Sequence, residues 1–179
     1  MTRKIVFFCF ITLIGFSCKK SKEVSNLPKE NTEVPIHVSS DEGKKWNVFG
    51  VQITGKILSD QSNDEYSVIV TETPAKGGPP MHTHTHEDEL FYILKGNFIF
   101  NCGDKKISAK KGDFIRLPRG IPHNFVNIDT VTGITMNTIT PGGFENFFND
   151  VAKVSKDKTL TKQKVDSLAH SYGVTFIKN

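Results

Sequence analysis

The sequence predicts an all-β domain, built as a sandwich or barrel, with helices only at its C-terminal end. Between Trp46 and Thr140, short runs rich in Val, Ile, Tyr and Thr alternate with turn residues, which is the pattern of strands. Roughly eight strands fit this region, without helical periodicity among them. After Pro141-Gly142-Gly143 the apolar spacing becomes helical. A chain of 179 residues with 37% hydrophobic and 23% charged residues can bury a core of this kind.

The first segment, residues 1–17, has the anatomy of a secretory signal peptide. A short basic start precedes an apolar run from Ile5 to Phe16, which is too short to span a bilayer comfortably. The end at Ser17-Cys18 resembles a bacterial lipoprotein signal, although Gly15 stands where such signals usually have leucine. That resemblance implies lipidation of Cys18 and a membrane-anchored protein of the cell envelope, periplasmic or on the outer surface. A plain secretory signal or an uncleaved anchor is the alternative.

Residues 18–45 are polar, poor in large apolar residues and interrupted by two prolines. Such a composition buries too little surface to offset the entropy of ordering, so we expect a disordered tether. With Cys9 in the signal and Cys18 lipidated, Cys102 is left alone in the barrel and cannot form an internal disulfide. No basic stripe alternates with aromatic residues, so nucleic acid is not an expected partner.

The barrel is expected over residues 46–142 and a helical extension packed on it over 143–179. In the extension, Phe144, Phe147, Phe148 and Val151 share one helical face, and such a face usually packs against a core. A second helix is expected to begin after the cap Thr161 and to end at Gly173.

The stretch from Pro79 to Gly96 is the first candidate for a functional site, because it contains three histidines at alternate positions. Alternate side chains of a strand share a face, so His82 and His84 can grip one metal ion. Glu89 has the opposite parity, so the chain must bend before it can join them. His123, which follows a proline-glycine turn, offers a fourth ligand from elsewhere in the chain.

These residues resemble the two motifs of the cupin family. His82 and His84 are followed by four residues and Glu89, then by six residues and Gly96, as in its first motif. The glycines before His82 are one or two residues too close. Its second motif is matched at every position by Gly112, Pro118, Gly120, His123 and Asn127. The wider context resembles the single-domain cupins labelled quercetin dioxygenase-like.

The resemblance implies a double-stranded β-helix, which is a jelly-roll barrel, with one divalent transition metal in its mouth. It implies His82, His84, Glu89 and His123 as metal ligands, with Glu89 also a possible catalytic base. Three imidazoles and a carboxylate suit Fe, Mn, Ni, Co, Cu or Zn, and with such an ion the site carries a charge of about +1. The remaining positive charge favours a substrate with an anionic oxygen, and a homodimer is a further expectation.

Several alternatives remain at this point. His84 and His86 could replace His82 and His84 as the ligand pair, whereas Glu87 and Asp88 are expected to be solvated. The favoured function is a dioxygenase acting on a small flavonol-like or otherwise enolisable molecule. A non-enzymatic module that binds or senses a small ligand is one alternative, and a metal-dependent isomerase or hydrolase is another.

Overall fold

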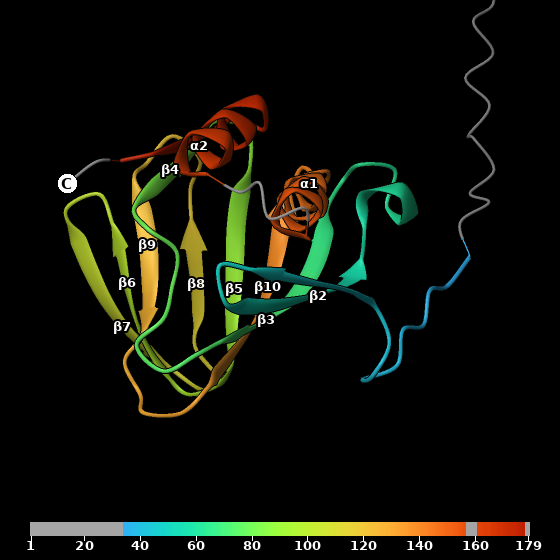
Figure 1. Ribbon diagram of the computed structural model, residues 1–179. Coiled ribbons are helices and arrows are strands. Elements are labelled where there is room, and N and C mark those ends of the chain that lie inside the picture. Colours follow the sequence, from blue (N-terminus) through green and yellow to red (C-terminus); the bar gives the residue numbers. More distant parts are fainter. Residues whose placement is uncertain (1–33, 157–160, 178–179) are drawn as a thin grey trace, which may run out of the picture. The chain divides into compact units, whose positions relative to one another are not determined.

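The computed structural model describes residues 34–156 and 161–177 (Figure 1). Within the described residues, those from Ile36 onward form one compact unit, which is a two-sheet β-barrel with two helices. The predicted signal peptide, the lipidation site Cys18 and most of the predicted tether lie outside the described residues. Within the two described ranges, no helix has the length and hydropathy that a bilayer span requires.

The barrel consists of two antiparallel sheets that face each other (Figure 1). The six-stranded sheet has the order β1 (Lys44–Val48), β2 (Val51–Ile57), β3 (Ser67–Thr73), β10 (Gly133–Thr140), β5 (Asp88–Lys95), β8 (Phe114–Leu117). The five-stranded sheet has the order β11 (Val174–Phe176), β4 (His82–His84), β9 (His123–Asn127), β6 (Asn97–Cys102), β7 (Lys105–Lys110). Strands distant in sequence are neighbours in both sheets, and this confirms the predicted jelly-roll barrel.

The start of the barrel differs in detail from the sequence-based expectation. Ten strands lie between Lys44 and Thr140, where roughly eight were expected. One reason is that the apolar run beginning at Trp46 folds back into a hairpin at Phe49 and Gly50, whose φ angles are +53° and +85°. A hairpin turn requires these positive angles. Phe rarely adopts them, so the run gives no turn signal at this point.

The residues just before the barrel are held against it. Residues 36–43, which the sequence assigned to the tether, belong to the same compact unit as the strands. The amine of Lys56 on β2 donates hydrogen bonds to the carbonyl oxygens of Ser39 and Ser40, at 2.8 and 2.9 Å. Strand β1 then begins at Lys44, two residues before the expected start at Trp46.

Two helices follow the barrel, and Figure 1 shows both at the same end of the sheets. Helix α1 spans Glu145–Lys156 and helix α2 spans Lys162–Ser171. The predicted cap of α2 is confirmed, since Thr161 Oγ1 accepts a hydrogen bond from the Lys164 amide, and Gly173 follows its end. The aromatic face predicted for α1 is buried, and comprises Phe144, Phe147, Phe148 and Val151.

The C-terminal extension also contributes a strand, which the sequence did not predict. Strand β11 pairs with β4, so that Val174 lies opposite His84 and Phe176 opposite His82. Three residues are too few to show an alternating pattern, and only the neighbouring strand makes this segment extended. The extension therefore completes the sheet that carries three of the four predicted ligands, His82, His84 and His123.

The buried apolar residues form two clusters within the barrel unit. One joins the six-stranded sheet to the helices and includes Trp46, Ile69 and Phe148. The other fills the part of the barrel enclosed by β5 to β9 and includes Phe98 and Leu117. Burial of this apolar surface is the main force that holds the two sheets together.

Candidate metal centre

Four side chains from three strands converge inside the barrel. Their ligand atoms all lie within 4.8 Å of one another, and every one of the four side chains is buried. They are the four predicted ligands, His82, His84, Glu89 and His123. Atoms that bind one ion at about 2.1 Å lie at most about 4.2 Å apart, so small rotations of the side chains complete such a site.

Strand pairing brings these residues together. His82 and His84 alternate along β4, and His123 at the start of β9 lies directly opposite His82. Glu89 comes from β5 in the facing sheet. The chain therefore crosses from one sheet to the other after His84, and this crossing is the bend that the opposite parity of Glu89 demanded.

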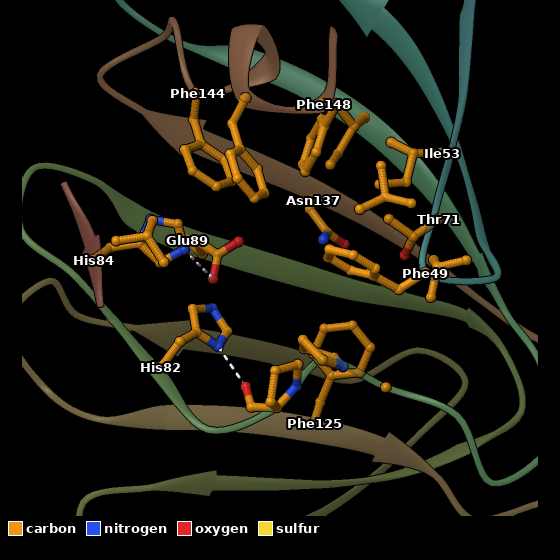
Figure 2. Close-up of a pocket in the computed structure, with 18 of the residues that line it drawn as sticks. Phe49, Ile53, Thr71, His82, His84, Glu89, Phe125, Asn137, Phe144 and Phe148 are labelled. Carbon is orange, nitrogen blue, oxygen red and sulfur yellow. Dashed lines mark hydrogen bonds and ion pairs between the residues drawn. The ribbon is translucent and has the colours of Figure 1, made fainter. Parts of the chain in front are cut away.

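Each imidazole is held through its Nδ1 atom by an oxygen that can only accept a hydrogen bond. These pairs are His82 with Pro80 O at 2.8 Å, His84 with Glu87 Oε2 at 3.1 Å, and His123 with Ile121 O at 2.8 Å (the first is drawn in Figure 2). Nδ1 is consequently the protonated nitrogen of the neutral ring, and Nε2 keeps its lone pair. This is how ligating histidines are usually oriented in metal sites.

The contact between Glu89 and His123 indicates that a cation belongs between them. Nε2 of His123 lies 3.2 Å from Oε2 of Glu89, and the corresponding atom of His84 lies 3.9 Å from the same oxygen. Within residues 34–156 and 161–177, His123 Nε2 is one of two buried side-chain polar atoms that lack a hydrogen-bond partner. A lone pair facing a carboxylate oxygen repels it unless a proton or a metal ion intervenes. The residues therefore fit a bound metal.

The ionisation of the donors suits the same conclusion. Burial acts to raise the pKa of Glu89, but a hydrogen bond from the His123 ring in its protonated form and the positive charges of the protonated imidazoles lower that pKa to about 2. Burial lowers the pKa of His82 to about 4, against the attraction of Glu89. At neutral pH the carboxylate is therefore anionic and the His82 ring neutral, and these are the forms that bind a metal.

Glu87 differs from the sequence-based expectation of a solvated side chain. It is buried, with 7% of its surface exposed, and it is the acceptor for His84. Burial acts to lower the pKa of His84, but the hydrogen bond with Glu87 and the charges of Glu89 and Glu87 outweigh it, so this pKa is raised. The only signal for Glu87 in the sequence is a weak one, namely that a carboxylate lies within the expected bend.

The two residues beside Glu87 do not join the donors. His86 is exposed, so the pair that converges is His82 and His84 and not His84 and His86. Asp88 is half-exposed and pairs with Arg116 and Arg119 at 2.9 and 3.1 Å. Hydrogen bonds from these arginines hold the pKa of Asp88 well below its usual range.

Two further residues of the second predicted motif, Gly120 and Asn127, hold the loops at the two ends of β9. Gly120 has a φ of +76°, and its amide donates a hydrogen bond to the carbonyl oxygen of His84 at 2.8 Å. Asn127 lies away from the donors, where its amide nitrogen donates to the carbonyl oxygens of Thr73 and Val131. These residues hold the loops and do not supply ligands.

A largely apolar pocket opens beside the donors (Figure 2). It encloses about 790 Å³ of empty space, part of which is open to solvent. In Figure 2 the donors His82, His84 and Glu89 lie at one end, and Phe49, Ile53 and Thr71 lie at the other. The pocket lining also includes Ile69, Phe125, Phe144 and Phe148. Four donors beside such a pocket can present a metal ion to a small organic molecule.

Comparison with known proteins addresses the segment that carries this site. Residues 68–136 match the family model of the cupin domain. All four donors lie within that match. Together with the fold, it supports membership of the cupin superfamily.

Two curated proteins resemble short parts of this chain. An uncharacterized protein of Methanocaldococcus jannaschii is 37% identical over 51 residues, which cover 28% of this chain and 41% of that protein. The acireductone dioxygenase of Gallus gallus is 48% identical over 48 residues, which cover 24% of this chain and 27% of the enzyme. The similarity thus spans less than half of the length of either relative.

Solved structures show the same fold. The crystal structure of an RmlC-like cupin from Shewanella frigidimarina superposes with a TM-score of 0.54 at 19% identity. The match covers 64% of this chain and 98% of that one. At this level of identity the likeness concerns the barrel and not its activity.

Proposed function

We propose that this chain binds one divalent transition metal through His82, His84, Glu89 and His123, and that it is a dioxygenase-like oxidoreductase. Its substrate would be a small flavonol-like or otherwise enolisable molecule that enters the apolar pocket. The observation that carries the proposal is the buried set of four donors at the end of that pocket. The local similarity to a protein named as a dioxygenase adds support.

A bound ion of this class would supply a Lewis acid for a deprotonated substrate oxygen and, for the redox-active metals, a route to react with oxygen. The protein supplies orientation and a largely apolar environment. Three Nδ1 hydrogen bonds fix the imidazoles. The apolar and aromatic lining lowers the local polarity, which strengthens the attraction between a cation and an anionic oxygen.

The ionisation of Glu89 bears on its role. The lowered pKa of Glu89 keeps this carboxylate ionised at neutral pH, which is the form that a ligand requires, and a carboxylate bound to a metal ion is a weak base. A substrate that is already acidic, such as an enol conjugated to a carbonyl, needs the least help from a base. This is the chemical reason for preferring enolisable substrates.

The test is oxygen uptake by the purified protein loaded separately with Fe, Mn, Co, Ni or Cu. We expect at least one metal form to consume oxygen with 3-hydroxyflavone or a related enol, and the metal-free protein and His123→Ala to consume none. Lack of uptake with a broad panel of enols in all five metal forms would reject the dioxygenase.

A second candidate is a non-enzymatic module that holds a small ligand. One observation favours it: apart from the three donors in its wall, the described residues that line the pocket include no acid or base. It predicts that ligands raise the melting temperature of the metal-loaded protein without oxygen uptake and are recovered unchanged.

We also propose that the chain is a lipoprotein of the bacterial cell envelope, anchored through Cys18. The support is the N-terminal sequence, with its basic start, apolar run and Ser17-Cys18 end. In a bacterial host, the wild-type protein should incorporate labelled fatty acid and sediment with membranes. Cys18→Ser should lose the label, and a labelled Cys18→Ser protein would contradict the assignment.

A further inference from the structure

Three polar side chains form a hydrogen-bonded chain in the barrel, on the sheet that lines the apolar pocket. Oγ1 of Thr71 on β3 lies 2.6 Å from Oγ1 of Thr135 on β10, and Thr135 donates to Oδ1 of Asn137 at 2.7 Å. All three side chains are buried, and Thr71 and Asn137 line the pocket. A polar group buried in an apolar wall is costly unless it finds a partner.

The direction of the hydrogen bonds defines what Asn137 offers to a ligand. A threonine hydroxyl has one hydrogen, and Thr135 uses it on Asn137, so Thr71 is the donor to Thr135. The Asn137 oxygen is thereby occupied, and its amide nitrogen remains as the donor. In Figure 2 this amide lies between Thr71 and Glu89, with its nitrogen on the Glu89 side.

Strand register places this amide near the metal-binding end of the pocket. On the β5–β10 ladder Ile139 pairs with Glu89 and Asn137 pairs with Phe91, so Asn137 and Glu89 are diagonal neighbours. Diagonal neighbours have backbones about 7–8 Å apart. Both side chains are in the pocket lining, so one small ring can reach both.

We propose that Asn137 is a specificity-determining residue that donates a hydrogen bond to an acceptor on the ligand, most simply a carbonyl oxygen. This rests on the proposed function, because the other end of the ligand is an anionic oxygen that would bind the metal ion at His82, His84, Glu89 and His123. The ligand class is then a flat, largely apolar ring that carries two oxygens in different roles. The oxygen that binds the metal ion is anionic, and the oxygen that accepts a hydrogen bond from Asn137 is neutral.

The experiment measures binding of matched phenols to the zinc-loaded protein by calorimetry, since zinc avoids turnover. The probes are 3- and 4-hydroxyacetophenone, each compared with the ethylphenol of the same substitution, which has a similar shape and no acceptor. The preference is the dissociation constant of the ethylphenol divided by that of the matching hydroxyacetophenone, and it is measured in wild type and in Asn137→Leu. A carbonyl also makes the phenol more acidic, but this effect is the same in both proteins. The preference of wild type divided by that of Asn137→Leu therefore isolates the hydrogen bond.

We expect this ratio to be roughly threefold to tenfold in favour of wild type for at least one isomer, which is the range for one net hydrogen bond. Thr135→Val, which removes the partner that orients Asn137, should reduce the ratio as well. Leu117→Val serves as a control, because Leu117 is buried in the other cluster and is not part of the pocket lining. Leu117→Val should leave the ratio unchanged, although it should lower the stability of the fold by about as much as Thr135→Val does.

The outcomes separate this proposal from the one on which it rests. If zinc binds and the ratio is close to one for both isomers, or no phenol binds, Asn137 does not select the ligand and the metal site stands. A ratio below one, meaning that Asn137→Leu prefers the carbonyl more, also overturns the proposal. If wild type binds no zinc at neutral pH, the proposed function itself fails.

Discussion

Oε2 of Glu87 lies 3.1 Å from Nδ1 of His84, and the side chains of both residues are almost completely buried. Because Nδ1 and Nε2 are on opposite sides of the ring, Glu87 holds the ring from behind while Nε2 faces the other donors. A carboxylate in this position fixes the tautomer and makes the ring a stronger ligand. Glu87 thereby acts on a metal through His84 and is a positioning residue.

Glu87→Ala should weaken zinc binding by about 10- to 100-fold, the usual effect of removing such a partner. Glu87→Gln should restore part of the affinity, since its amide oxygen can still accept from His84. Competition with a coloured chelator measures both affinities, and the visible spectrum of the cobalt-loaded protein should change in Glu87→Ala.

The neighbouring carboxylate provides the control for Glu87. Asp88 pairs with two arginines and does not contact the imidazoles, so Asp88→Asn should bind zinc as tightly as wild type. Equal zinc affinities and cobalt spectra for Glu87→Ala and wild type would show that the hydrogen bond has no role in the site.

His123 should be required for stabilisation by metal. A ligand that binds only the folded state at 100 times its dissociation constant adds about 2.7 kcal/mol to the free energy of unfolding. At the zinc concentration that gives this gain in wild type, His123→Ala should gain far less, because it lacks one of the four donors. Chemical denaturation with and without zinc measures the gain.

His86→Ala is the matched control for His123, since His86 is exposed and lies apart from the four donors. It should keep the whole zinc-dependent gain. If His86→Ala lost the zinc-dependent gain in the free energy of unfolding and His123→Ala kept it, His86 would be the ligand and the assignment of His123 would be wrong.

The alternating and turn-rich pattern of the sequence predicted a β-sandwich or barrel, and strand alternation predicted that His82 and His84 share one face. The convergence of these two residues with Glu89 and His123 was implied by the resemblance to the cupin motifs and could not be derived from spacing alone. The burial of Glu87 could not be predicted in the same way. It depends on how the bend after His84 packs against strands that are distant in sequence.

Asn137 was missed for a different physical reason. Along β10 the polar Thr135 and Asn137 face the interior, whereas the apolar Ile134 and Met136 lie on the half-buried outer face. This is the reverse of the pattern that usually indicates which face of a strand is buried. From the sequence alone, the side chain of Asn137 would be expected on the outer face of the strand, away from the pocket. Only the pairing of β10 with β3 and β5 shows that this side chain faces the interior.

Glu145 at the start of α1 should make stability depend on pH. Its buried carboxylate accepts hydrogen bonds from the Ser59 amide at 2.8 Å, the Ser67 hydroxyl at 2.6 Å and the Gly143 amide at 3.0 Å. Burial acts to raise the pKa of Glu145, but these bonds outweigh it and lower that pKa below its ordinary 4.5. The ionised form therefore stabilises the folded state.

Because the folded pKa is lowered, this stabilisation is complete above the unfolded pKa and is lost as the pH falls through the folded value. Glu145→Gln should cost about 1–3 kcal/mol at pH 7, as expected for weakening charged hydrogen bonds. Unfolding free energies should show this difference shrinking below about pH 4.5. Glu72→Gln, at an exposed position on β3, should differ little from wild type. A difference for Glu145→Gln that stays constant down to pH 3 would contradict this role for the carboxylate.

Strand β11 should support the metal site although it contributes no ligand. Strand β4 is paired with β9 only at His82 and His123, whereas β11 pairs with all three residues of β4. Thr175 lies opposite Thr83, between the two ligands of β4, and its side chain is exposed. Proline at this position cannot donate to the ladder.

Thr175→Pro should therefore loosen β4 and weaken zinc binding by roughly tenfold, comparable to the loss of a supporting partner of a ligand. Thr175→Val keeps the backbone amide and a β-branched side chain, so it should bind zinc like wild type. Hydrogen exchange should show faster exchange of the β4 amides in Thr175→Pro, with the β6–β7 hairpin unchanged. If Thr175→Pro exchanges faster in β4 but binds zinc normally, the donors are held by their own hydrogen bonds and the support from β11 is dispensable.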